Sequence, residues 1–248
     1  MSDSALQAGP ASGAPLDLGE LWASEVRPQP YPHLVVGNLL SDGTAERLDQ
    51  AFPTIPMSGF VTLEDRAISP AFHQLDLALK GDDLTEALSS KFGRDMHPYP
   101  RLVTVRRWSR AGEGKIHTDS ERKVMTLLLY LNETWPQDAG GQIRVLHDGR
   151  RFEPYALEVP PLMGRAFAFV RSDHSWHGHL PYVGERRVVQ VTWLRDEAAM
   201  ERKRANNRFH QGLKRLFGKG DAGRPQPEGL SRHKGEERPA DCPKRPGI

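Results

Sequence analysis

Two short segments of the sequence carry side chains of the kinds that bind transition metals. His117 and Asp119 stand two residues apart in a region of strand-like composition. Residues two apart on a strand point to the same face, so this imidazole and this carboxylate are predicted to be presented together. Such a pair is a weak signal alone, but a second segment follows near residue 177. It holds three histidines, namely His174, His177 and His179.

One of these histidines can complete a set of two imidazoles and one carboxylate. Such a set holds a metal ion on one face and leaves positions open, which suits mononuclear Fe(II) oxygenation chemistry. A third feature is the pair Arg186 and Arg187, at the start of the last apolar run. An arginine that enters a buried strand needs an anion as its partner, unless its head group reaches the surface.

Short strands separated by turns are predicted to position these residues. Apolar and β-branched runs predict strands at 33–36, 102–108, 124–131, 142–146, 165–170 and 186–194. Helices are predicted ahead of most of them, at 41–52 with Ser41 as the cap, from residue 69 or 70, and from residue 83. This order predicts a mainly β fold with flanking helices (α+β), a sandwich or jelly-roll with helices packed on it.

The ends of the chain differ from its middle in composition. Residues 1–28 and 218–248 are predicted to be disordered, because such sequences bury too little apolar surface to offset their ordering entropy. Residues 29–196 are predicted to form one domain, with a β core at about 100–196. Residues 197–217 read as a basic amphipathic helix, docked on the sheet with its charged face in solvent. Contact of that face with an anionic membrane or nucleic acid is the alternative.

Composition sets further limits on function. A single cysteine among 248 residues excludes an intrachain disulfide and a cysteine-based zinc cluster, and it predicts a reducing location, the cytoplasm. The formal net charge of +2 is too small to indicate a nucleic-acid partner. No apolar run is long enough for a transmembrane helix, and the first residues do not form a signal-peptide pattern.

The order and spacing of these motifs resemble the 2-oxoglutarate- and Fe(II)-dependent dioxygenases of the prolyl-4-hydroxylase-like superfamily. The resemblance runs from about Arg101 to Leu194, and His177 follows Asp119 by 58 residues. Its further motifs are the run TLLLYLN at 126–132, Trp135, Gly140-Gly141, and the stretch from Trp176 to Trp193. The resemblance implies a double-stranded β-helix, or jelly-roll, with N-terminal supporting helices.

The resemblance also implies which residues bind iron. His117, Asp119 and His177 would be the three ligands. His177 is preferred over its neighbour two residues on, because Gly178 and Pro181 match the family pattern His-Gly-x-x-Pro.

The co-substrate contacts follow in the same way. The family's basic residue lies six residues before a tryptophan and binds the distal carboxylate of 2-oxoglutarate. This spacing selects Arg187 with Trp193 as the marker, and Arg186 is the alternative. Tyr130 matches a tyrosine that hydrogen-bonds the same carboxylate in some relatives.

The resemblance therefore implies a hydroxylating dioxygenase that uses Fe(II), 2-oxoglutarate and O2, with ascorbate as a candidate reductant, and releases succinate and CO2. A nucleic-acid dealkylase is disfavoured, because Trp193 stands where such enzymes carry a second arginine. The alternative is a cupin-like jelly-roll metal protein or a metalloenzyme that does not use 2-oxoglutarate. The substrate stays open among a small molecule, a glycan or lipid precursor, and a peptidyl residue.

Overall fold

The computed structural model describes residues 13–217. The strands are β1 (Val26–Arg27), β2 (His33–Val36), β3 (Val61–Thr62), β4 (Arg101–Ser109), β5 (Lys123–Tyr130), β6 (Ile143–Leu146), β7 (Tyr155–Val159), β8 (Ala166–Val170), β9 (His177–Gly178) and β10 (Gly184–Leu194). The helices are α1 (Leu18–Ala23), α2 (Thr44–Gln50), the 3-10 turn η1 (Leu63–Asp65), α3 (Pro70–Lys80), α4 (Asp82–Phe92) and α5 (Glu197–Phe217).

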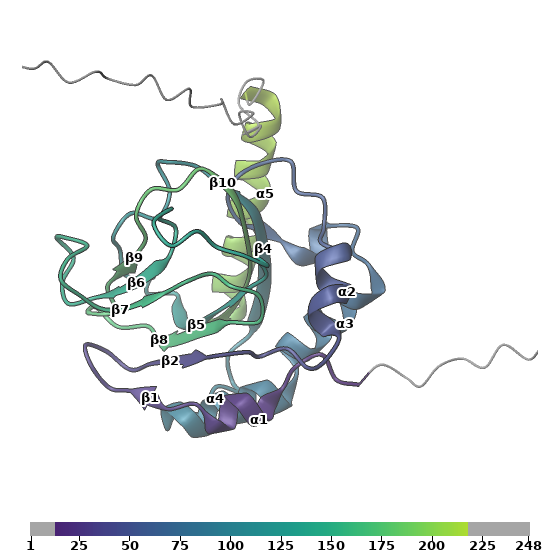
Figure 1. Ribbon diagram of the computed structural model, residues 1–248. Helices are drawn as coiled ribbons and strands as arrows, with labels where there is room; N and C mark the ends of the chain where they lie inside the picture. The colour runs from purple at the N-terminus through teal and green to yellow at the C-terminus, as the bar shows by residue number, and fades with distance from the viewer. Residues whose placement is uncertain (1–12, 218–248) are drawn as a thin grey trace, which may run out of the picture.

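The strands form two antiparallel sheets that face each other. The large sheet has the order β1-β2-β8-β5-β10-β4-β3, and the small sheet has the order β7-β6-β9. Figure 1 shows helices α2 and α3 on one side of the large sheet and the small-sheet strands on the other. This mainly β arrangement is consistent with the predicted jelly-roll.

The large sheet is buried on both faces. On one face, Leu127 and Val191 pack with Leu75 of α3 in the main apolar cluster. On the other face, Leu128 packs with Val145 of the small sheet in a second cluster. Successive side chains of a strand alternate between faces, so a strand buried on both sides is apolar throughout. This explains the continuous apolar run of β5.

Several predicted elements are confirmed with small shifts of their ends. The strand predictions correspond to β2, β4, β5, β6, β8 and β10, whereas no strand was predicted at β7. Helix α3 begins as predicted, because the Ser69 hydroxyl accepts a hydrogen bond from the Phe72 amide at 3.3 Å. The prediction of Ser41 as a helix cap was wrong. Gly43 is the N-cap of α2, and the Ser41 hydroxyl instead donates to the carbonyl of Ala14.

The N-terminal prediction also needs a correction. Residues 13–28 are ordered rather than disordered. Leu16 forms an isolated antiparallel β-bridge with Leu40, and the side chain of Leu21 in α1 is completely buried. The Asp17 carboxylate caps α1 by accepting a hydrogen bond from the Glu20 amide at 3.2 Å. The predicted disorder of residues 1–12 and of the tail from residue 218 concerns parts of the chain outside the described residues.

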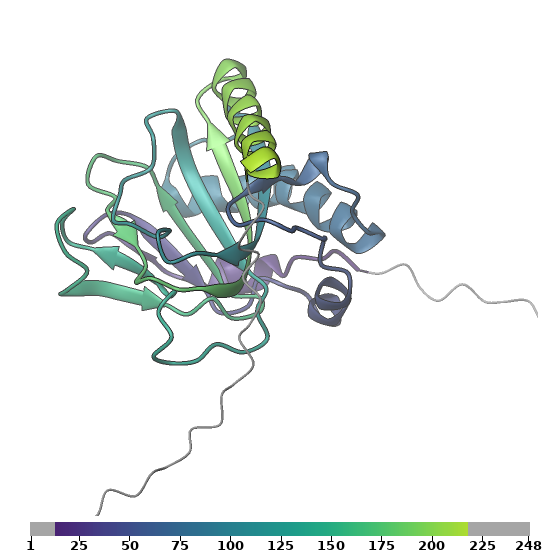
Figure 2. The same cartoon turned by 90° about the horizontal axis from the view of Figure 1, so that it is seen from above.

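Helix α5 turns back over the inner face of the large sheet, the face toward the small sheet. Its first turn packs Ala199 and Met200 against Leu102 and Leu194. Figures 1 and 2 both show α5 lying along β10. Within the described residues, no helix has the length and apolar character needed to span a membrane.

The two leucines of α3 offer a matched test of this packing. Leu75 is fully buried, whereas Leu77 is 58% exposed on the same helix. We expect Leu75→Ala to lower the free energy of unfolding by about 2–5 kcal/mol, because it leaves a cavity in the core. Leu77→Ala should stay within about 0.5 kcal/mol of the unmodified protein. Urea unfolding followed by circular dichroism measures both, and equal losses would contradict the assigned faces.

Candidate metal centre

Two segments far apart in sequence meet through their backbones at the candidate centre. The amide of His117 donates to the carbonyl of His177, and the amide of His177 donates to the carbonyl of His117, both at 3.0 Å. His177 lies on β9 and pairs with Val145 of β6. His117 and Asp119 lie in the loop before β5 and not on a named strand, so the predicted strand location was wrong although the residues are presented together.

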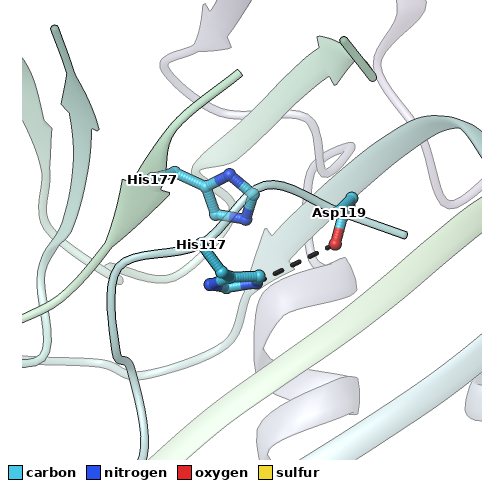
Figure 3. Close-up of side chains that lie close together, drawn as sticks. All are labelled: His117, Asp119 and His177. Carbon is cyan, nitrogen blue, oxygen red and sulfur yellow. Dashed lines mark ion pairs between the residues drawn. The ribbon is translucent and has the colours of Figure 1, made fainter. Parts of the chain in front are cut away.

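The three predicted ligands converge on one point. One ligand atom from each of His117, Asp119 and His177 lies within 4.8 Å of the other two. The Nε2 atom of His117 is 3.9 Å from Oδ1 of Asp119, and the two imidazole centroids are 4.4 Å apart. Figure 3 shows both rings and the carboxylate facing a common space. Two nitrogens and one oxygen on one side of a metal ion form the facial set.

The backbone orients both imidazoles for metal binding. Nδ1 of His117 lies 2.8 Å from the carbonyl of Lys115, and Nδ1 of His177 lies 2.9 Å from the carbonyl of Ser175. A carbonyl only accepts hydrogen bonds, so each Nδ1 carries the proton and each Nε2 keeps its lone pair. Burial lowers the pKa of His177 to about 4, which keeps this ring neutral near pH 7.

The third ligand is held as a carboxylate. Lys123 donates to Oδ1 of Asp119 at 2.6 Å, and the Thr126 hydroxyl donates to Oδ2 at 2.6 Å. Burial by itself would raise the pKa of the Asp119 carboxyl. The charge of Lys123, the neighbouring His177 and these two hydrogen bonds outweigh burial and hold that pKa well below its usual range.

A cavity of about 340 Å³ extends from the three ligands into the space between the sheets. Its lining combines apolar side chains with several cations. The cations are Arg106, Lys123, Arg186 and Lys203. The apolar walls include Phe60, Leu128, Ile143 and Phe169. Cavities of this size and mixed lining suit small molecules.

Arg186, rather than Arg187, faces this cavity. Arg186 is 3% exposed, and its Nε donates to the carbonyl of Gly141 at 2.8 Å. Its guanidinium lies 5.4 Å from the ring centroid of Tyr130. Within the described residues, Arg186 forms no ion pair with a carboxylate. This buried cation therefore lacks an anionic partner.

The placement of Arg187 corrects the preference drawn from the sequence. Arg187 does share strand parity with Trp193, but that parity belongs to the helix-covered face of β10. Its guanidinium pairs with Asp49 and with Glu185 and lies 5.0 Å from the ring of Phe52. The register of β10 with β4 shifts at a bulge between Glu185 and Val188. Arg187 lines a separate cavity with Asp49 and Glu185.

Tyr130 lies next to Arg186 at the inner end of the site. Its side chain is fully buried, and its hydroxyl lies beside the Arg186 guanidinium and has no hydrogen-bond acceptor within the described part of the chain. Burial raises the pKa of the Tyr130 hydroxyl to about 12, so this group stays a neutral donor. A buried hydroxyl without a partner is costly, and a carboxylate at this end would satisfy it.

Sequence reasoning missed several cavity residues. Thr126 shares strand parity with Leu128 and Tyr130 on β5, and this alternation is a usable signal. Lys123 and Lys203 showed no such signal. Lys203 lies on α5, whose basic residues were all assigned to a solvated face, and only the path of that helix brings this lysine to the cavity.

Comparison with known proteins identifies the segment that carries this geometry. Residues 103–195 match the model of the 2OG-Fe(II) oxygenase superfamily. Over these residues the chain is similar to the 2OG-Fe(II) oxygenase superfamily. The match contains all three members of the triad and both arginines of β10. The superfamily implies an oxidoreductase that uses Fe(II), 2-oxoglutarate and O2, and the donor set of His117, Asp119 and His177 fits the metal.

Solved structures similar to this chain include a Phytophthora capsici prolyl 4-hydroxylase. The two are 22% identical over 65% of this chain and 58% of that chain, with a TM-score of 0.44. A Trichoplax adhaerens prolyl hydroxylase, in complex with a hypoxia inducible factor peptide, has 20% identity over 70% and 86% of the two chains and a TM-score of 0.49. A Burkholderia pseudomallei oxidoreductase of the 2OG-Fe(II) oxygenase family has 14% identity over 66% and 84%, with a TM-score of 0.47. These low values transfer no substrate to this chain. No curated protein matches it.

The ligand assignment predicts different effects on Fe(II) binding for a residue of the triad and for a histidine outside it. We expect Asp119→Ala to weaken Fe(II) binding by more than about 10-fold, because it removes the only carboxylate of the triad. His174→Ala is the matched control, since His174 is exposed and lies outside the triad. Anaerobic titration with Fe(II) measures both affinities. Full Fe(II) binding by the Asp119 variant would refute the assignment.

Proposed function

We propose that this chain is an Fe(II)- and 2-oxoglutarate-dependent dioxygenase that hydroxylates an unactivated C–H bond. In the overall reaction, substrate, 2-oxoglutarate and O2 yield hydroxylated substrate, succinate and CO2. The observation that carries the proposal is one cavity with an Fe(II)-type donor set at one position and an unpaired buried arginine at another. A dicarboxylate such as 2-oxoglutarate would fit both features, since its keto-acid end can chelate the metal and its other carboxylate can pair with the arginine.

His117, Asp119 and His177 are the proposed iron ligands. The carbonyls of Lys115 and Ser175 keep both rings in the tautomer that offers Nε2 to the metal. The Thr126 hydroxyl holds the outer oxygen of Asp119 and leaves Oδ1 directed toward His117. These contacts orient the donors before the metal arrives, so little ordering remains for binding.

Arg186 and Tyr130 are the proposed contacts of the distal carboxylate of 2-oxoglutarate. Arg186 offers charge, and Tyr130 offers a neutral hydroxyl whose proton lacks an acceptor in the described part of the chain. The carbonyl of Gly141 holds the Arg186 side chain through Nε, which leaves its terminal nitrogens for a ligand. Arg187 takes no part in this proposal, since its charge is already met by Asp49 and Glu185.

The cofactors supply the oxidising chemistry, in which decarboxylation of 2-oxoglutarate is coupled to insertion of one atom of O2 into the substrate. The chain contributes placement and exclusion of water. Leu128, Ile143 and Phe169 form apolar walls beside the ligands, which favour a dry reaction site. We further propose a cytoplasmic location on the basis of the single cysteine, and ascorbate as a reductant.

The two adjacent arginines provide the sharpest test. We expect Arg186→Met to raise the Kd for 2-oxoglutarate by about 10- to 100-fold, because a hydrogen bond to a charged group contributes about 1.5–3 kcal/mol. Arg187→Met should leave that Kd unchanged. Anaerobic titration of the Fe(II)-loaded protein, followed through the metal-to-ligand charge-transfer band, measures both values.

Two outcomes would contradict the proposal. A larger effect at Arg187 than at Arg186 would reverse the assignment of the carboxylate site. Bound metal without any charge-transfer band would instead favour the cupin-like metal protein, for which Arg186 has no co-substrate to bind. His117→Ala serves as the control in which the band should vanish because a metal ligand is lost.

A further inference from the structure

Helix α5, which begins after the segment matched by the superfamily model, contributes to the wall of the cavity. Lys203 and Asn207 of this helix line the same space as the metal ligands. Asn207 donates from Nδ2 to the Thr62 hydroxyl of β3 at 3.2 Å. Lys203 lies near Thr192 of β10, with Nζ 3.3 Å from the Thr192 hydroxyl. The helix therefore holds a primary amine beside the reaction site.

Ion pairs along its other side fix the helix in this position. Arg204 contacts Glu64 at 3.1 Å, and Arg208 contacts Asp65 at 3.3 Å. Both partners lie in η1, which follows β3. Arg204 and Arg208 thus have carboxylate partners in η1, whereas Lys203 faces the cavity.

The charges in the cavity do not balance. Arg106 lies 3.5 Å from Glu113, and Lys123 lies 2.6 Å from Asp119. Within the described residues, neither Arg186 nor Lys203 forms an ion pair with a carboxylate. Burial and the nearby ammonium of Lys123 together lower the pKa of Lys203 to about 7, although the charge of Asp119 acts in the opposite direction. Unpaired cations in a partly desolvated site favour a bound anion.

Metal binding would increase this imbalance near Lys203. Oδ1 of Asp119 is the oxygen that Lys123 contacts, and it is also the oxygen that faces Nε2 of His117. A metal held by that oxygen would compete with Lys123 for the same negative charge. Since 2-oxoglutarate is assigned to Arg186, Lys203 is left without an anion of its own, and Lys123 would share Asp119 with the metal.

We propose that Lys203, together with Lys123, binds an anionic group of the substrate, a carboxylate or a phosphate, beside the metal centre. This inference rests on the proposed function and names a substrate class for it. A lysine is a flexible point charge and suits either anion, whereas the inner end of the site has a planar guanidinium suited to the co-substrate carboxylate. Lys203 would thus bind substrate and would not be a ligand of the iron.

Simple anions can test this site without knowledge of the substrate. The probes are acetate and inorganic phosphate, with acetamide as the neutral control, added to the full chain loaded with Fe(II) and saturating 2-oxoglutarate without O2. Calorimetry measures probe binding directly, and perturbation of the charge-transfer band reports its proximity to the metal. We expect acetate or phosphate to bind and acetamide not to bind.

Two variants on the same helix separate the site from its surroundings. Lys203→Met should weaken anion binding by about 10-fold or more, because it removes the charge but keeps the length of the side chain. Arg202→Met is the matched control, since Arg202 is an exposed cation one residue away. We expect it to leave anion binding unchanged. The melting temperature of Lys203→Met should not fall, because the substitution removes an unpaired, partly buried charge.

The other possible results would refute either this inference or the proposed function, and they can be told apart. Equal anion affinity in the unmodified protein and the Lys203 variant, or no anion binding at all, would refute the substrate site. A rise in the Kd for 2-oxoglutarate in Lys203→Met as large as that in Arg186→Met would assign Lys203 to the co-substrate instead. Absence of the charge-transfer band from the unmodified protein would refute the proposed dioxygenase, whereas a normal band without Lys203-dependent anion binding refutes this inference alone.

Discussion

Two reciprocal backbone hydrogen bonds between His117 and His177 hold the candidate centre together. They join the loop before β5 to strand β9, and so they connect the large sheet to the small one. Further backbone carbonyls, those of Lys115 and Ser175, set the tautomers of the two rings. The direction of both metal-binding nitrogens is therefore decided by main-chain geometry.

The large sheet makes this geometry rigid because both of its faces are buried. Helices cover one face, and the small sheet with α5 covers the other. Protein interiors are close-packed, so a strand between two apolar layers has little freedom to shift. Thr126 on β5 and Arg186 on β10 are held at fixed positions on the inner face as a result. The cavity remains where the small sheet and α5 leave this face uncovered.

Charge gives the cavity its chemical character. Asp119 and Glu113 each have a cationic neighbour, whereas Arg186 and Lys203 lack carboxylate partners in the described part of the chain. A folded protein tolerates such groups when a ligand supplies the missing anion or when function requires them. The proposed co-substrate and the proposed anionic substrate each account for one of these cations.

The amino-acid sequence by itself determined most of the elements of this protein and the types of its candidate metal ligands. Alternation and apolar runs are local properties, so β4, β5 and β10 were predictable, as was α3 with its Ser69 cap. The triad was predictable because His117, Asp119 and His177 stand in motifs whose order is recognisable. The ordered segment at 13–28 was missed, because short elements such as α1 depend on tertiary packing of Leu21 rather than on propensity.

Only the tertiary structure decided which cations face the cavity. Strand parity grouped Arg187 with Trp193, but parity does not say which face of a doubly buried strand lies toward the site. Arg187 lies on the helix-covered face and pairs there with Asp49 and Glu185, whereas Arg186 faces the cavity. The role of Lys203 depends in the same way on the path of α5 over the sheet. Contacts between residues distant in sequence set these choices, and no local pattern encodes them.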